Sequence, residues 1–205
     1  MMINGVINKE IQPRNTLFSR SQCFLKRAVP LALLLSLFLG TNRGTAVDKP
    51  LSEYQIKALF LFNFAKYVAW PTDTFANDKT PLVIGVLGEN KIGDGLNESV
   101  KGKQVNGREI VIRRFEIEHA LDTCHILFIS VSEKKHLREI FLKTKAVPVL
   151  TVGETEQFIH QGGIINFVKK EDKVRLEINA DSAAQSKLQI SSKLLNVADV
   201  VKGRK

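Results

Sequence analysis

The sequence predicts an α/β fold: a single-domain α/β sandwich with a largely parallel central sheet, flanking helices and a C-terminal antiparallel hairpin. Short apolar runs typical of buried strands alternate with segments of helical periodicity, as in a parallel sheet covered on both faces. The last two strand-like runs, residues 164–168 and 173–178, are separated by only four polar residues, which indicates a hairpin. No repeat, low-complexity run or proline-rich linker suggests a second domain.

The N-terminal 46 residues have the features of a secretory signal peptide, which leaves residues 47–205 as the folded domain. Basic residues precede an apolar run from Ala28 to Leu39, and small residues at positions 44–46 provide a cleavage site. The apolar run is too short to span a bilayer, which takes about 20 residues. Cys23 lies before this run rather than after it, so no lipid anchor is expected. We therefore expect a mature protein that begins at Val47 and works outside the cytoplasm.

Removal of this leader changes the charge and the cysteine content. The full chain has 30 Lys and Arg against 21 Asp and Glu, but residues 47–205 have 24 against 20. This ordinary balance gives no support to nucleic-acid binding. Cys124 is then the one cysteine left, so no internal disulfide is expected. The Cys124 side chain is either a buried apolar group or a reactive or intermolecular thiol.

The first predicted element is a helix over residues 53–68. Ser52 and Gln55 have the spacing of a capping box, and Trp70-Pro71 stops the helix. The middle of the helix is apolar almost all round, so we expect it to be buried on more than one side.

The remaining elements follow from apolar periodicity and from the positions of glycine. The interval between the first two strands has room for a short helix ending near residue 100. Strands are expected at 82–87, 109–115, 125–131 and 147–152, an amphipathic helix at 132–143, and a short helix at 154–160. After the hairpin, the pattern is helical at 180–185 and again from 191 or 192 to 201.

The sequence contains no recognisable catalytic, cofactor-binding or metal-binding motif. The segment 88–94 comes close to a phosphate-binding loop, but Asp94 stands where that loop requires lysine. The histidines, acids and cysteine at 118–125 do not have metal-ligand spacing, because Cys124 and His125 should point to opposite faces of a strand. We therefore expect no metal and no cofactor. An enzyme assembled from residues distant in sequence remains the weakest alternative.

Three segments together resemble the YfiR-like family of periplasmic proteins. They are KALFLFNFAKYVAWP at 57–71, GGIINFV at 162–168 with VRLEIN at 174–179, and LQISSKLL at 188–195. The resemblance covers residues 52–201. It implies a periplasmic regulator rather than an enzyme, one that binds the periplasmic part of an inner-membrane diguanylate cyclase and represses it. It also implies an OmpA-like outer-membrane lipoprotein as a second partner; a homodimer is a further assembly that stays open.

The chain departs from the family pattern in its cysteines. Paired cysteines in similar proteins lie near Cys124 and in the first strand, where this chain has Gly85, and a second pair around residues 162–167 is missing. Redox control through intramolecular disulfides is therefore not expected here.

A row of polar side chains on the penultimate strand is the first candidate site. Alternation places Arg175, Glu177 and Asn179 on the face opposite Leu176 and Ile178. We expect this row to bind a ligand or partner, with two further residues nearby after the return turn, Gln189 and Ser191. The alternative is a solvated strand face, in which Asn179 ends the strand through its own side-chain hydrogen bond.

The first helix supplies a second candidate surface. Phe60 and Trp70 are large aromatic residues of the kind that anchor interfaces, and Lys66 keeps one side of the helix in water. Packing of the aromatic residues in the core is the alternative.

Two functions therefore remain to be distinguished. A regulator that acts through protein contacts should expose an apolar patch, whereas a small-molecule sensor should have a concave pocket lined by Glu177.

Overall fold

A computed structural model describes residues 50–89 and 91–201, so the predicted leader and its cleavage site lie outside the described residues. The helices and strands along this part of the chain are α1 (Glu53–Tyr67), β1 (Val68–Ala69), β2 (Leu82–Leu87), α2 (Gly93–Val100), β3 (Gln104–Val105), β4 (Arg108–Phe115), β5 (Ile126–Ile129), α3 (Leu137–Thr144), β6 (Leu150–Gly153), β7 (Ile165–Lys170), β8 (Lys173–Asn179), α4 (Ala180–Gln185), β9 (Gln189–Ile190), α5 (Ser192–Leu195) and β10 (Asp199–Val201). Four 3₁₀ turns join them: η1 (Thr72–Thr74), η2 (Leu121–Thr123), η3 (Val131–His136) and η4 (Ile159–Gln161).

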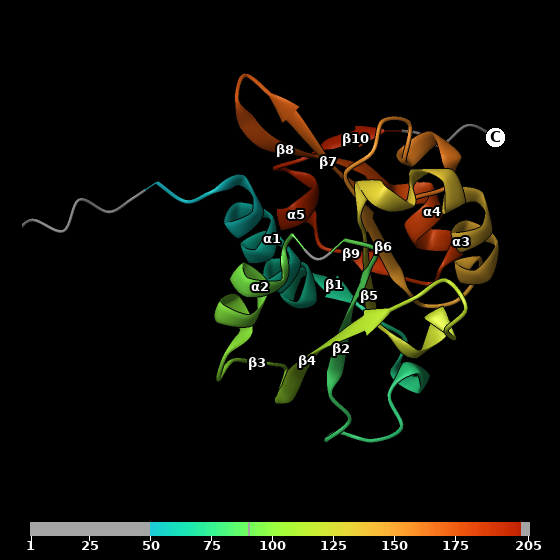
Figure 1. Cartoon of the computed structure of the whole chain (residues 1–205). Coiled ribbons are helices and arrows are strands. Elements are labelled where there is room, and N and C mark those ends of the chain that lie inside the picture. The colour runs from blue at the N-terminus through green and yellow to red at the C-terminus, as the bar shows by residue number, and fades with distance from the viewer. Residues whose placement is uncertain (1–49, 90, 202–205) are drawn as a thin grey trace, which may run out of the picture. The chain divides into compact units, whose positions relative to one another are not determined.

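The central sheet confirms the predicted α/β class. Its strand order is β10-β8-β7-β6-β5-β2-β4-β3, and the five strands from β7 to β4 run parallel. β8 is antiparallel to β7, β10 is parallel to β8, and β3 is antiparallel to β4. A separate two-stranded sheet pairs β1 with β9. Figure 1 shows α1 and α2 on one side of the sheet and α3 on the other.

Helix α1 begins as predicted and ends slightly earlier. The Ser52 Oγ accepts from the Gln55 N–H at 3.3 Å, and the Gln55 side chain accepts from the Ser52 N–H at 2.8 Å, so the capping box is confirmed. The helix ends at Tyr67, before Trp70-Pro71, because Val68 and Ala69 leave it to pair with β9. Its buried residues form one broad face, and Leu59, Lys66 and Tyr67 on the other side are exposed, so the burial is narrower than the sequence predicts.

Two predicted helices are wrong in extent. The segment 132–143 begins as the 3₁₀ turn η3, in which the Glu133 N–H bonds to the Ser130 carbonyl, and only its second part is the α-helix α3. The segment 154–160 ends in the three-residue turn η4 instead of forming a helix. Its Phe158 ring lies where Gly153 and Gly163 have no Cβ, and this packing keeps the segment folded down onto the sheet.

The C-terminal segment also differs from the prediction. The hairpin is confirmed, but its turn is the two residues Glu171 and Asp172, both with positive φ (51° and 57°). Such a turn follows the right-handed twist of the strands. The predicted helix after Ser191 is only α5, and the chain then forms strand β10 beside β8. Pairing with the open edge of β8 outweighs the helical spacing of the apolar residues.

The sheet separates two apolar cores. The larger core joins α1 and α2 to one face and includes Phe64, Phe128 and Phe167. The smaller core joins α3 to the other face and includes Leu137, Ile140 and Phe158. Within the described ranges, the chain has no helix with the length and hydropathy needed to span a membrane.

Candidate functional site

The polar row on β8 has the orientation that alternation predicts. Leu176 and Ile178 belong to the larger core, so Arg175, Glu177 and Asn179 point to the other face of the sheet. Arg175 is exposed and Glu177 is half-buried, whereas Asn179 is buried. The row is therefore open to solvent at its Arg175 end only.

Glu177 lies in a line of polar side chains that crosses three strands. It pairs with Asn166 on β7 and with Asp199 on β10. The Asn166 amide donates to its carboxylate at 3.5 Å, and Lys170 holds Asp199 at 2.6 Å. Hydrogen bonding and the charge of Lys170 lower the pKa of Asp199, so this carboxylate stays ionised. The buried Asn166 Oδ1 has no hydrogen-bond partner among the described residues.

Asn179 has a structural role in this arrangement. Its Oδ1 accepts from the Ser182 N–H at 2.9 Å, and its Nδ2 donates to the Ile159 carbonyl at 3.3 Å. These bonds cap α4 and tie it to η4. Both polar atoms of the side chain are used inside the protein, as expected when an asparagine ends a strand.

Gln189 and Ser191 do not continue the β8 row. Gln189 pairs with Ala69 in the small β1–β9 sheet. The Ser191 N–H donates to the Tyr67 carbonyl at 2.9 Å, and its hydroxyl accepts from the Lys193 N–H at 3.3 Å. These residues therefore lie at the end of α1, where they connect α5 to it.

The aromatic candidates on and after α1 pack inward. Phe60 stacks on Phe64 with ring centroids 6.1 Å apart and lies 6.0 Å from Phe167. Trp70 is half-buried, and its indole N–H donates to the His125 carbonyl at 3.2 Å. Lys66 is exposed, with its ammonium 4.4 Å from the Phe62 ring centroid. Of these three candidates, Lys66 alone presents its side chain mainly to solvent.

A groove runs beside the exposed end of the β8 row. Its volume is ≈ 440 Å³. Charged and apolar side chains share its wall: Lys170, Glu171, Arg175, Leu176, Asn196, Val197, Ala198 and Asp199. Val197 is 62% exposed, and Val200 on β10 is 55% exposed. Val200 pairs with Ile178 and therefore points to the other face of the sheet. We refer to Arg175, Glu177, Val197 and Asp199 as the β8–β10 surface.

The structure contains a buried ion pair that the sequence analysis missed. The Lys57 ammonium lies 2.6 Å from Glu154 and 2.6 Å from Glu53, and the side chains of Lys57 and Glu154 are 6% and 5% exposed. Burial lowers the pKa of Lys57, but its bonds to the two carboxylates outweigh this effect and raise it, so the ammonium stays charged. The four-residue spacing of Glu53 and Lys57 was the available signal for half of this cluster. Glu154 enters only through the tertiary fold.

Cys124 and His125 are both engaged in the interior. Burial raises the pKa of the Cys124 thiol to about 12, which makes it unreactive. The Phe115 ring packs against Gly85, so a side chain at position 85 would collide with it. The His125 Nδ1 accepts from the Val83 N–H at 3.0 Å, and burial, then Arg108, lowers its pKa to about 4. Neither residue is available for chemistry at the surface.

Comparison with known proteins identifies the family of the chain. Residues 54–199 match the YfiR/HmsC-like family, a family of periplasmic, non-catalytic regulators of diguanylate cyclase signalling. A solved structure, a conserved domain protein from Vibrio cholerae O1 biovar El Tor str. N16961, is similar at a TM-score of 0.48 and 13% identity. That similarity covers 74% of this chain and 61% of the other. No curated protein matches the sequence. The family match over residues 54–199, which runs from α1 to β10, shows that the chain belongs to the YfiR/HmsC-like family.

Proposed function

We propose that the protein binds the periplasmic part of an inner-membrane diguanylate cyclase and holds that enzyme inactive, which lowers cyclic-di-GMP signalling. The observation that carries this proposal is the family match over residues 54–199, which spans the helices and the sheet of the described chain except for Glu53 and the last two residues of β10. An exported regulator that stays in the periplasm can reach a cyclase only through the part of the enzyme on that side of the membrane.

We place the contact with the cyclase on the β8–β10 surface. Exposed apolar side chains beside charged ones are typical of transient protein interfaces, where the charges orient the partner. Val197 supplies exposed apolar area beside Arg175 and Asp199, which line the same groove, and Glu177 pairs with Asp199. β10 is the last strand in the sheet order, so a strand of the partner can pair with its outer edge.

Two further assemblies belong to this proposal. An OmpA-like outer-membrane lipoprotein would relieve repression by occupying the same surface in place of the cyclase. A homodimer through the edge of β10 would compete with both. Arg175→Glu should weaken binding to both the cyclase and the lipoprotein if they share this surface.

The proposal is tested by deleting the gene and measuring intracellular cyclic-di-GMP. We expect the level to rise and the wild-type protein to lower it again. Arg175→Glu and Glu177→Ala should restore repression poorly. Arg113→Glu is the matched control, because it makes the same charge change on an exposed residue of β4, a strand near the other edge of the sheet.

The outcomes separate the function from the surface. An unchanged cyclic-di-GMP level in the deletion strain would reject repression of a cyclase. Full repression by both β8 variants would reject the β8–β10 surface but not the function. Each variant must accumulate to wild-type amounts in periplasmic extracts, so that misfolding is not counted as loss of binding.

A second candidate function is that of a periplasmic small-molecule sensor that acts on another signalling partner. Glu177 does not line the groove beside β8, although Arg175 does. A separate pocket between α3 and α4 is the observation that favours this candidate.

A further inference from the structure

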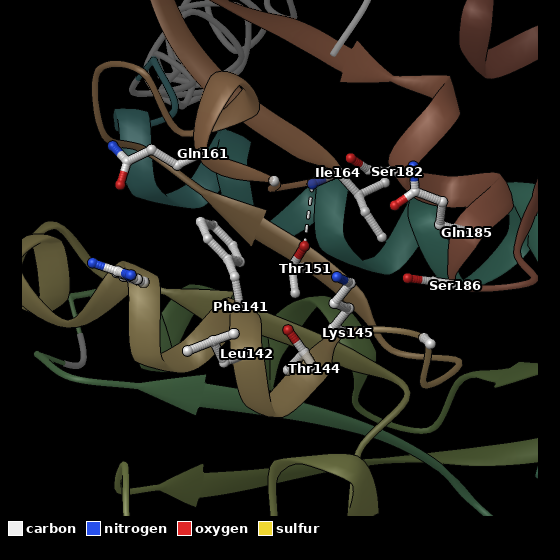
Figure 2. Close-up of a pocket in the computed structure, with 13 residues that line it drawn as sticks. Phe141, Leu142, Thr144, Lys145, Thr151, Gln161, Ile164, Ser182, Gln185 and Ser186 are labelled. Atoms are coloured by element: carbon white, nitrogen blue, oxygen red, sulfur yellow. Dashed lines mark hydrogen bonds between the residues drawn. The ribbon is translucent and has the colours of Figure 1, made fainter. Parts of the chain in front are cut away.

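A second pocket lies between α3, α4 and the segment at the end of η4 (Figure 2), and it shares no lining residue with the groove beside β8. Its volume is ≈ 410 Å³, which is within the range of small-molecule sites. Arg138, Phe141 and Lys145 come from α3 and its C-terminal end, and Ser182 and Gln185 come from α4. The sheet contributes Thr151 of β6 at the base.

The charge of this pocket is positive. Arg138 and Lys145 line it, and none of the lining residues that the structure describes is acidic. Neither cation has an ion-pair partner within residues 50–89 and 91–201, whereas Lys143, on the same helix, pairs with Glu139 at 3.1 Å. Two cations that are not neutralised by a carboxylate favour an anionic ligand in the pocket.

A buried hydroxyl lies where such an anion would meet the sheet. Thr151 is 3% exposed, and its Oγ accepts from the Ile164 N–H at 3.1 Å. That bond uses a lone pair of the hydroxyl and leaves its proton free to donate. In Figure 2 the Lys145 side chain extends toward Thr151, so the ammonium and the hydroxyl face the same space.

Part of the remaining wall is apolar, although Thr144, Gln161, Ser182, Gln185 and Ser186 also line the pocket. The Phe141 ring packs edge-on against Phe158 with centroids 5.2 Å apart, and Ile164 is 2% exposed. Leu142 is 69% exposed, which leaves an apolar side chain at the pocket that a bound ring or chain would cover. The wall therefore suits a ligand with an apolar body as well as a charged group.

We propose that this pocket binds a small organic anion, a carboxylate or phosphate monoester that carries an apolar ring or chain. Lys145 and Arg138 neutralise the anion, Thr151 donates to one of its oxygens, and Phe141 and Leu142 pack on its apolar part.

The test uses three probes and the full gene product purified after export. The probes are 4-phenylbutyrate, phenyl phosphate and the uncharged analogue 4-phenylbutyramide, each titrated into ¹⁵N-labelled protein and followed by NMR. We expect saturable shifts of the Thr151, Ile164 and Ser182 amides with at least one anion. The carboxylate should bind at least tenfold more tightly than its amide, and preference for the phosphate would identify phosphate monoesters as the ligand class.

A pair of charge-reversal variants isolates the cations of the pocket. Arg138→Glu with Lys145→Glu should weaken anion binding at least tenfold. Lys134→Glu with Lys135→Glu is the matched control, because these exposed residues of η3 change the net charge equally and do not line the pocket. The control should bind like the wild type.

Four results would overturn the proposal. They are no saturable binding tighter than about 1 mM by either anion, equal affinity for the carboxylate and its amide, equal loss of binding in the two double variants, and amide shifts that map to other elements. Because binding is measured on the isolated protein, these outcomes are independent of whether the protein represses a cyclase.

Discussion

Lys57 and Glu154 form a buried ion pair, and we expect removal of the lysine to destabilise the fold more than removal of the glutamate charge. At 2.6 Å and an effective dielectric constant of about 20, the attraction between the two charges is roughly 6 kcal/mol. Desolvation of two ions costs several kcal/mol each, so the pair as a whole stabilises the fold little. Removal of one partner is different, because it leaves the other charge buried alone.

Lys57→Met should therefore lower the free energy of unfolding by about 3–5 kcal/mol. In this variant Glu154 keeps only the Val131 N–H, at 3.4 Å. Glu154→Gln should cost less, about 1–2 kcal/mol, because Lys57 retains Glu53 at 2.6 Å and the amide oxygen can still accept a bond. The double variant should recover much of the loss caused by Lys57→Met.

Urea unfolding followed by circular dichroism measures these differences, provided that the slope with denaturant is the same in all variants. Lys66→Met is the control, since it removes an exposed lysine from the same helix and should change stability by less than about 0.5 kcal/mol. The reasoning is refuted if Lys57→Met costs no more than Lys66→Met, or if Glu154→Gln costs more than Lys57→Met.

Three further predictions concern residues in the interior and in the hairpin turn. The pKa of His125 falls from 6.5 to about 4 on folding, so the unfolded chain binds the proton first as the pH falls. The free energy of unfolding should therefore drop by about 3 kcal/mol between pH 6.5 and pH 4. A midpoint of urea unfolding that stays constant over this range would contradict this prediction. Cys124 should not react with a thiol reagent in the native protein and should react fully in urea, and rapid native labelling would show that it is accessible. Glu171→Asn with Asp172→Gly should raise the free energy of unfolding by about 1 kcal/mol, because both residues have positive φ; an unchanged or lower unfolding midpoint would count against this turn geometry.

The sequence predicts well those elements whose signal is local. The capping box at Ser52 places the start of α1, and the apolar run at 82–87 coincides with β2 because a buried parallel strand needs apolar residues on both faces. The predicted strand at 147–152 begins later, at Leu150, since Pro148 has no N–H for the sheet. Local patterns carry this information because each depends on neighbours within a few residues.

The C-terminal segment shows where local patterns fail. The apolar spacing after Ser191 indicates a helix, but β10 forms because β8 has an open edge that only the folded sheet provides. The pairing of β1 with β9 joins residues about 120 positions apart and separates Gln189 and Ser191 from the β8 row. No spacing within either segment indicates that contact.

The two candidate sites also differ in how much of each could be predicted from the sequence. The orientation of Arg175 and Glu177 follows from the alternation of side chains along one strand, so the sequence predicts the face of β8 on which they lie but not the neighbouring strand β10. The pocket between α3 and α4 needs residues from positions 138–186, because the fold places these two helices and Thr151 of β6 around one space. Asn179 connects the two regions, since it ends the strand that carries Glu177 and caps the helix that lines the pocket. Asn179 therefore fixes the position of one wall of the pocket relative to β8.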